Sequence, residues 1–138
     1  MYISETTIRV RYGETDQMGY VYYGCYAMYY EVARVESLRK LGVTYREIEA
    51  MGIMMPVLEN KSSYLAPGRY DELLRIVTTL REKPGVRSRF EYDIYNEQNK
   101  LIHRGETLLA FVSVSTGRPC RPPEAMQKVL EPYFKNEV

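Results

Sequence analysis

The sequence has no tryptophan, one histidine and two cysteines in 138 residues. Cys25 and Cys120 are too few and too far apart for a disulfide framework, a zinc site or a CxxC redox pair, so we expect free thiols. With His103 as the one histidine, a Ser-His-Asp triad or a zinc centre has little support. The sequence therefore predicts neither a bound metal nor a redox cofactor.

An excess of either charge is also missing, because 19 Lys and Arg stand against 18 Asp and Glu. A nucleic-acid-binding protein would carry a basic excess on one face. No apolar stretch approaches the roughly 20 residues that a membrane helix needs, and residues 1–5 have neither the basic start nor the apolar run of a signal peptide. We expect a cytoplasmic, single-domain protein over residues 1–138, with no membrane insertion and a small-molecule or protein partner.

Alternating apolar residues and a run of tyrosines are what the sequence does have. Residues 86–95 place Val86, Ser88, Phe90, Tyr92 and Ile94 on one face of a strand. Gly105 lies inside a later strand, where it predicts a β-bulge. The expected elements are a strand over 6–12, a helix from Gly24 to Leu41 ended by Gly42, a short helix over 45–50, strands within 53–66, 72–82, 86–95 and 101–115, and a terminal helix over 122–134.

The helix from Gly24 to Leu41 is apolar on nearly every side in its first half, which predicts that it is enclosed. Short turns between the later strands indicate an antiparallel meander. An enclosed helix needs a sheet that curves around it, and a single sheet leaves its other face bare. A second copy of the chain is the common cover for such a face.

Residues 12–26, "YGETDQMGYVYYGCY", place a lone acid and two glycines among tyrosines just before this helix. Together with "YYEVAR" at 29–34, they resemble the signature of the hotdog-fold acyl-CoA thioesterases. The most similar branch is the 4-hydroxybenzoyl-CoA thioesterase group, which includes the Tol-Pal-associated thioesterases. The segments "SYLAPGRYDELLRIVTTL" at 63–80 and "GETLLAFVSVSTGRPCRPP" at 105–123 extend the resemblance over nearly the whole chain.

The resemblance implies an α+β hotdog fold, in which a curved antiparallel five-stranded sheet wraps one long central helix. It also implies hydrolysis of an acyl-CoA thioester with Asp16 as nucleophile or general base. Thioester hydrolysis needs such a carboxylate and donors for the oxygen that gains charge. The N–H groups of Tyr23 and Gly24, at the helix start, are the predicted donors. On spacing alone, Asp16 can equally be a plain turn or N-cap residue.

The predicted substrate site draws on more residues than these. Gly19 lets backbone and ligand approach closely, and basic residues around the "KPG" turn can bind coenzyme A phosphates or simply form a solvated hairpin. The resemblance implies that the Asp16 loop of one subunit meets the Met54–Met55 strand of another, in a homodimer or homotetramer. The remaining predicted contacts are Tyr22, Cys25 and Tyr26 as pocket walls, Arg81, Lys83 and Arg87 as phosphate contacts, with Arg89 in the same cluster, and Ser88, which either touches ligand or fills the sheet.

Four other polar residues have alternative roles. Glu31 is a rival carboxylate, but Arg34 at i+3 favours a structural pair. Glu14 is interpreted as a solvated loop residue, and His103 as a surface or interface histidine. Cys25 as a nucleophile has no base near it in sequence.

Three functional hypotheses remain at this point. The first is an acyl-CoA thioesterase that needs no cofactor beyond the coenzyme A of its substrate. The second is a hotdog protein that binds acyl-CoA or acyl carrier protein without turnover, suggested because Tyr23 and Cys25 stand where relatives often have His and Asn. The third is a hydratase or dehydratase, for which His103 is poorly placed. The acyl group, and the choice between coenzyme A and acyl carrier protein, stay open.

Overall fold

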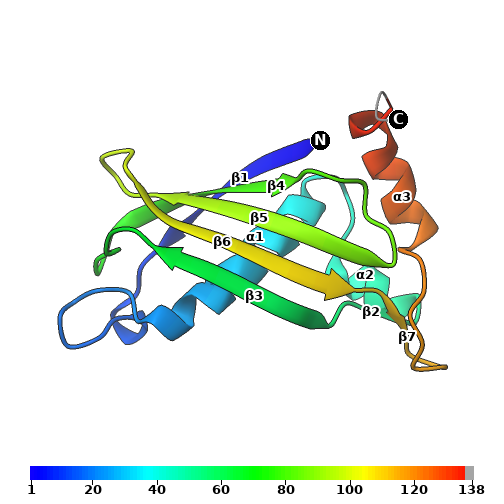
Figure 1. Cartoon of the computed structure of the whole chain (residues 1–138), viewed down its shortest axis with the longest axis horizontal. Helices are drawn as coiled ribbons and strands as arrows, with labels where there is room; N and C mark the ends of the chain where they lie inside the picture. The colour runs from blue at the N-terminus through cyan, green and yellow to red at the C-terminus, as the bar shows by residue number, and fades with distance from the viewer. Residues whose placement is uncertain (136–138) are drawn as a thin grey trace.

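Five antiparallel strands form one curved sheet, and the long helix α1 (Tyr26–Arg39) lies across one face of it (Figure 1). The computed structural model describes residues 1–135. The strand order is β1-β4-β5-β6-β3. These strands are β1 (Tyr2–Arg9), β3 (Val57–Tyr64), β4 (Leu73–Leu80), β5 (Arg87–Tyr95) and β6 (Leu101–Ala110). The predicted α+β architecture, a sheet curved over one long helix, is confirmed.

Smaller elements lie at the two ends of α1. The loop before the helix, with the short 3-10 helices η1 (Tyr12–Glu14) and η2 (Tyr23–Cys25), is at one end of the molecule. At the opposite end lie the short helix α2, the two-stranded sheet and the terminal helices (Figure 1). These are α2 (Tyr45–Ala50), β2 (Ile53–Met54) paired with β7 (Val112–Ser113), α3 (Glu124–Leu130) and η3 (Glu131–Tyr133).

The strand over 87–95 follows its sequence pattern. Ser88, Phe90, Tyr92 and Ile94 are buried against α1, while Arg87 and Arg89 are exposed. Successive side chains of a strand point to opposite faces, so the alternation in sequence becomes alternation in burial. Val86 departs from the prediction, because it precedes β5 and is exposed.

The strand bounds differ from the prediction mainly at the N-terminus. β1 begins at Tyr2 and ends at Arg9, whereas the prediction placed it over 6–12. Pro56 lies just before β3, one of the two edge strands of the sheet, where the missing N–H of a proline interrupts no strand pairing. Gly42 ends the α1 region in the left-handed conformation (φ 85°), and its N–H donates to Arg39 O at 2.9 Å.

The prediction that α1 is enclosed is wrong for a single chain. Met28 and Val32 are 47% and 42% exposed. The buried residues recur every three or four positions, which is one face of a helix. They are Tyr26, Tyr29, Tyr30, Ala33, Arg34, Ser37 and Leu38. One sheet covers one side of the helix, so the apolar side chains on the other side remain uncovered in the chain.

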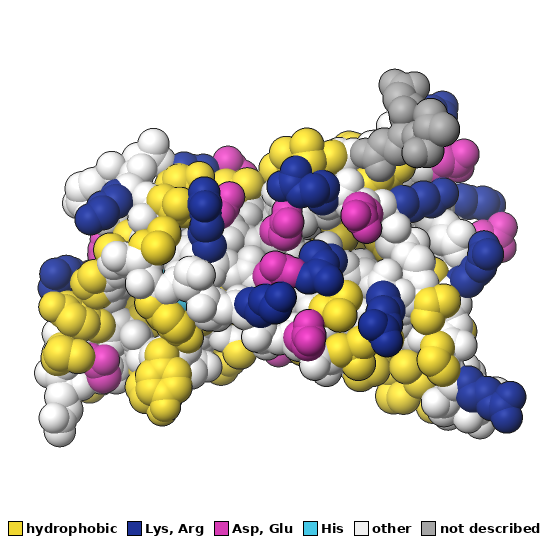
Figure 2. All heavy atoms as spheres, in the orientation of Figure 1, with side chains coloured by type: hydrophobic (Ala, Val, Ile, Leu, Met, Phe, Trp, Pro, Cys, Tyr) yellow, Lys and Arg dark blue, Asp and Glu magenta, His cyan; other side chains and the backbone are white. Residues whose placement is uncertain are grey.

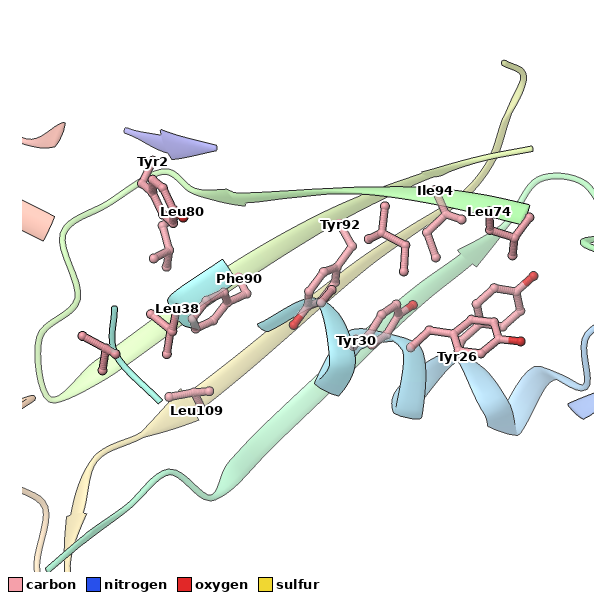
Figure 3. Close-up of a cluster of buried hydrophobic side chains, with 14 of the residues drawn as sticks. Tyr2, Tyr26, Tyr30, Leu38, Leu74, Leu80, Phe90, Tyr92, Ile94 and Leu109 are labelled. Atoms are coloured by element: carbon pink, nitrogen blue, oxygen red, sulfur yellow. The ribbon is translucent and has the colours of Figure 1, made fainter. Parts of the chain in front are cut away.

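The core fills the space between that face of α1 and the sheet (Figure 3). Tyr30 of α1 points toward Tyr92 of β5, and their rings are stacked with centroids 4.4 Å apart and planes 2° apart. Leu38 and Phe90, both fully buried, continue the core toward the other end of the helix. Each such side chain contributes about 1.5–3 kcal/mol through burial.

The predicted β-bulge at Gly105 is absent. Gly105 is in regular register, opposite Tyr92 of β5 and Ser62 of β3. The register shifts of the described sheet fall instead between Val57 and Glu59 and between Ile94 and Tyr95. A glycine fits this position because the Tyr30 ring of α1 packs directly onto the strand and occupies the space where a side chain at 105 would stand.

Candidate functional site

Asp16 lies in the loop between β1 and α1, and its carboxylate is held on one side only. Its Oδ1 accepts hydrogen bonds from the N–H groups of Met18 at 2.9 Å and Tyr20 at 3.2 Å. Gly19 makes this turn possible in the left-handed region, with φ of 76°. Within residues 1–135, Oδ2 of Asp16 makes no hydrogen bond. One oxygen therefore orients the carboxylate and the other is left for a ligand.

Asp16 also lines a cavity of about 650 Å³ on this loop. Gly19 and Gln17 lie beside it, and Tyr12 and Tyr70 form the aromatic part of the wall. The rings of these two tyrosines meet edge to face, with centroids 5.6 Å apart. Tyr70 was not among the predicted site residues, although it belongs to the 63–80 segment that resembles the thioesterases. A group that enters the cavity can reach the Asp16 carboxylate.

The helix start offers two backbone donors. Among the described residues, neither the Tyr23 N–H nor the Gly24 N–H has an acceptor, whereas the Cys25 N–H donates to Tyr22 O at 2.9 Å. The Tyr22 ring covers Gly24 so closely that an added Cβ would lie 2.8 Å from it. Tyr23 is 67% exposed. Unpaired N–H groups at the positive end of a helix attract an oxygen that carries negative charge.

The predicted pocket tyrosines divide into two groups. Tyr22 and Tyr23 stay at the surface, with ring centroids 4.5 Å apart. Tyr26 is buried, and its ring stacks on His103 with centroids 3.8 Å apart. Tyr26 is therefore part of the core of this chain rather than the wall of the Asp16 cavity.

Glu14 is not the solvated loop residue that the sequence predicted, because it is only 7% exposed. Its Oε1 accepts from the Arg11 N–H at 2.8 Å and from the Tyr29 hydroxyl at 3.1 Å, and Oε2 accepts from the Arg11 guanidinium at 3.2 Å. Burial, followed by the charge of Glu14, raises the pKa of Tyr29, which keeps the phenol a donor. Glu14 thus ties the loop to α1.

The predicted pair between Glu31 and Arg34 does not form. Glu31 is exposed, whereas Arg34 is 5% exposed and donates to three hydroxyl groups. Those acceptors are Tyr92 at 3.0 Å, Thr107 at 3.2 Å and Tyr45 at 3.3 Å. Among the described residues no carboxylate lies within ion-pair distance of Arg34.

The prediction of a surface or interface position for His103 is also wrong, because the ring is fully buried. It lies between Tyr26 and Tyr64, and its Nε2 is hydrogen-bonded to the Tyr30 hydroxyl. Its Nδ1 has no partner within residues 1–135. Burial lowers the pKa of His103 to about 4, so the ring is neutral near pH 7.

Met54 and Met55 lie far from Asp16 in the chain, because β2 and the Asp16 loop are at opposite ends of α1 (Figure 1). They line a second cavity of about 310 Å³, bounded by α2 and β2. Its wall is mostly apolar and includes Ile48 and Ile53. One chain therefore brings Asp16 and Gly19 together, and it keeps Met54 and Met55 apart from them.

The predicted phosphate contacts are scattered. Arg81 donates two hydrogen bonds to Glu91, at 2.9 and 3.1 Å, so its charge is already paired. Arg89 is paired with Glu106. Ser88 is buried on the helix side of the sheet, where it packs in the core. Lys83 and Arg87 are exposed and, within residues 1–135, have no carboxylate partner.

Basic and acidic side chains intermingle over the sheet face that looks away from α1 (Figure 2). The cross-strand pair of Arg104 with Asp93, at 3.2 Å, is part of this pattern. Exposed pairs of this kind contribute about 0–1 kcal/mol each. Side chains of both charges therefore lie side by side on this face.

Both cysteines are free, as predicted. Burial raises the pKa of the Cys25 thiol, and the charge of Glu14 raises it further, which makes the thiol a weaker nucleophile. Within residues 1–135, no group of three or more His, Cys, Asp or Glu side chains is arranged to hold a metal ion. None of the described helices is long and apolar enough to cross a membrane.

Comparison with known proteins places the chain beside thioester-cleaving enzymes. Residues 10–130 match the model of the thioesterase-like superfamily. The acyl-CoA thioester hydrolase YbgC of Escherichia coli is 31% identical over 93% of this chain and 92% of its own. The DHNA-CoA thioesterase of Staphylococcus aureus is 35% identical, with a TM-score of 0.84 over 99% of this chain and 86% of its own. The hypothetical protein TT1821 of Thermus thermophilus is 37% identical, with a TM-score of 0.86 over 93% and 97%.

Proposed function

The chain belongs to the thioesterase-like superfamily and is a thioester hydrolase, and we propose that Asp16 supplies its reacting carboxylate. The substrate is an acyl-CoA thioester. One observation carries this assignment: Oδ1 of Asp16 is held by two backbone N–H groups while Oδ2 is free at the wall of a cavity. A carboxylate fixed on one side and open on the other is oriented for attack or for proton abstraction.

Two roles for Asp16 fit this geometry. As a nucleophile, Oδ2 forms a bond to the thioester carbon, the C–S bond breaks, and water then cleaves the resulting anhydride. As a general base, Oδ2 takes a proton from a water molecule that attacks the same carbon, and the proton passes to the leaving thiolate. Both give a free acid and coenzyme A, and both need a donor for the carbonyl oxygen as it gains charge.

The N–H groups of Tyr23 and Gly24 are the proposed donors for that oxygen. Their support is that neither has an acceptor among the described residues, at the positive end of α1. Loss of one such donor costs about 2.7–4 kcal/mol of transition-state stabilisation in other enzymes. Gly24 suits this position because the Tyr22 ring leaves no room for a side chain there.

A second copy of the chain completes the proposed site. Asp16 and the cavity at Met54 and Met55 lie at opposite ends of α1, so an antiparallel neighbour would bring the loop of one protomer to the cavity of its partner. Two uncovered surfaces suit such a neighbour: the apolar side of α1, with Met28 and Val32, and the exposed edge strand β3. The proposal is a homodimer or homotetramer with shared active sites.

The remaining parts of the proposal concern the carrier and the compartment. Lys83 and Arg87 are the candidates for the coenzyme A phosphates, because Arg81 is engaged by Glu91. Acyl carrier protein is the alternative carrier. No cofactor is required beyond the coenzyme A of the substrate. Free thiols at Cys25 and Cys120 suit a reducing compartment, and we place the protein in the cytoplasm.

The test compares Asp16→Asn with wild type on a panel of short, medium, aromatic and long acyl-CoAs, with free thiol as the readout. Wild type should hydrolyse some members, and Asp16→Asn should lower kcat by at least about 100-fold. Glu31→Gln is the matched control, since Glu31 is exposed on α1, and it should keep its activity. Full activity of Asp16→Asn would reject the assignment. Binding of acyl-CoA without thiol release by wild type would favour the second candidate, a binding protein without turnover.

A further inference from the structure

The cavity beside Met54 and Met55 has two polar residues in an otherwise apolar wall. Ile48 of α2 and Ile53 of β2 share the wall with these methionines, and Tyr45 stands among them. Glu49 also borders the cavity but is exposed to solvent. An apolar site with a few placed polar groups is the usual form of a small-molecule pocket.

The hydrogen bonds behind Tyr45 have a fixed direction, because an arginine side chain only donates. Arg34 donates to Tyr92, Tyr92 donates to Thr107 at 2.9 Å, and Thr107 donates to Asn60 at 2.7 Å. Every hydroxyl proton on this branch therefore has an acceptor. The branch ends on Asn60 in the edge strand β3.

The other branch ends differently. Arg34 Nε donates to the Tyr45 oxygen at 3.3 Å, so the Tyr45 hydroxyl accepts there and keeps its own proton to donate. Within residues 1–135 that proton has no acceptor. Burial raises the pKa of Tyr45 even though the Arg34 guanidinium lowers it, so the phenol is protonated at neutral pH. Tyr45 thus lines an apolar cavity, and within residues 1–135 its hydroxyl is a donor without an acceptor.

We propose that Tyr45 is a specificity-determining residue, which donates a hydrogen bond to an acceptor oxygen at the far end of the acyl group. This inference rests on the proposed function, in which the acyl group occupies the cavity lined by Met54 and Met55. The apolar wall takes the carbon skeleton, and Tyr45 binds the terminal oxygen. Arg34 acts through Tyr45, because its buried guanidinium forms no ion pair with a carboxylate of the described chain and donates to the Tyr45 oxygen, which strengthens the donor.

A hydroxyl and a carboxylate share the required chemistry, since both present an acceptor oxygen. Three esters of equal chain length separate the possibilities: hexanoyl-CoA, 6-hydroxyhexanoyl-CoA and adipoyl-CoA, which ends in a carboxylate. Wild type should favour at least one oxygen-bearing ester over hexanoyl-CoA in kcat/KM by about tenfold, the scale of one hydrogen bond to a ligand. The preferred ester identifies the terminal group.

Tyr45→Phe removes the donor and keeps the ring. It should bring the ratio of kcat/KM for the oxygen-bearing ester to kcat/KM for hexanoyl-CoA close to one. Tyr95→Phe is the matched control, because Tyr95 lies on β5 with its ring under Arg75 and should leave the ratio unchanged. A purely structural role of Tyr45 would change stability or all three rates together, and not their ratio.

Binding is measured separately by calorimetry, with the same three esters titrated into Asp16→Asn and into the double variant that also carries Tyr45→Phe. The ratio of the Kd values of the plain and oxygen-bearing esters then reports the Tyr45 contact independently of turnover. If wild type has similar kcat/KM values for the oxygen-bearing and plain esters, the inference is overturned. It is also overturned if the preference, in kcat/KM or in Kd, survives Tyr45→Phe. Absence of thiol release by wild type from every member of the wider acyl-CoA panel would instead overturn the proposed function. If Tyr45→Phe does not fold, Met54→Trp fills the cavity and leaves the Arg34–Tyr45 bond in place. Unchanged binding of all three esters to that variant would also overturn the inference.

Discussion

The phenol end of Tyr30 in α1 occupies the space directly over Gly105 in β6. An added Cβ at Gly105 would overlap the ring and hydroxyl of Tyr30. The ring has no room to move, because its face stacks on Tyr92 and its hydroxyl bonds Ser62 Oγ at 2.5 Å and His103 Nε2. This contact limits how closely the helix and the sheet can approach at Gly105.

Gly105→Ala should therefore destabilise the protein. Overpacking of a filled core costs about 1–3 kcal/mol, and Gly105 is in regular strand pairing that cannot shift to make room. The measurement is the free energy of unfolding by urea. Gly85→Ala is the control, since nothing lies within 4 Å of a Cβ built at Gly85. Equal losses in the two variants would contradict the packing argument.

Glu14→Ala should loosen the loop that carries Asp16. The change leaves the Arg11 N–H and the buried Tyr29 hydroxyl without an acceptor, which costs about 1–3 kcal/mol. The backbone bond from Tyr22 N–H to Glu14 O survives the change, but without the Glu14 side chain the loop that carries Asp16 loses its tie to α1. The loop should therefore lose order, and kcat should fall with stability. Glu36→Ala removes only an exposed helix pair with Arg39 and should cost less than about 0.5 kcal/mol. Normal kcat in Glu14→Ala would show that this anchor does not position the loop.

His103 should make stability depend on pH. Burial lowers its pKa from 6.5 to about 4, so between these values the unfolded chain binds a proton that the folded chain does not. The free energy of unfolding therefore carries no His103 penalty above about pH 6.5. It falls as the pH drops toward 4, by up to about 3 kcal/mol. Free energies of unfolding for wild type and His103→Gln, measured at several pH values, isolate this contribution from that of the carboxylates. Parallel pH curves for the two proteins would rule it out.

Mixing two inactive variants should restore activity if the active site is shared. Asp16→Asn lacks the carboxylate, and Met54→Trp fills the cavity at the other end of α1. In a mixed dimer one site carries both changes and the other carries neither. After random exchange of chains, half the dimers are mixed, so about a quarter of wild-type activity should return. Thiol release is compared before and after mixing, with each variant alone as the control. No recovery, despite mixed dimers detected by mass spectrometry, would count against a shared site.

Much of the fold could be predicted from local patterns. The alternation over 86–95 and the glycine after the long helix gave a strand and a helix end close to those observed. The order of elements and the short turns favoured an antiparallel sheet, which the structure has. Asp16 and Gly19 were predicted together because they stand three positions apart in one loop, and both line the same cavity.

The wrong predictions for Arg34, Glu14 and His103 share a physical cause, since each residue contacts a partner that is distant in sequence. Arg34 was paired with its neighbour Glu31, yet its acceptors Tyr92 and Thr107 are 58 and 73 positions away. Glu14 was predicted in solvent and His103 at the surface or an interface, and both are buried against α1. Tyr45 drew no attention, because nothing in its local sequence shows that Arg34 stands behind it.

By itself, the sequence determined the elements, their order and the loop that carries the acidic residue, because these depend on backbone preference and on neighbours along the chain. Only the tertiary structure decided which polar side chains are buried and what they bind. A hydrogen bond needs its two partners within about 3 Å, and it is the packing of α1 on the sheet that brings such distant residues together.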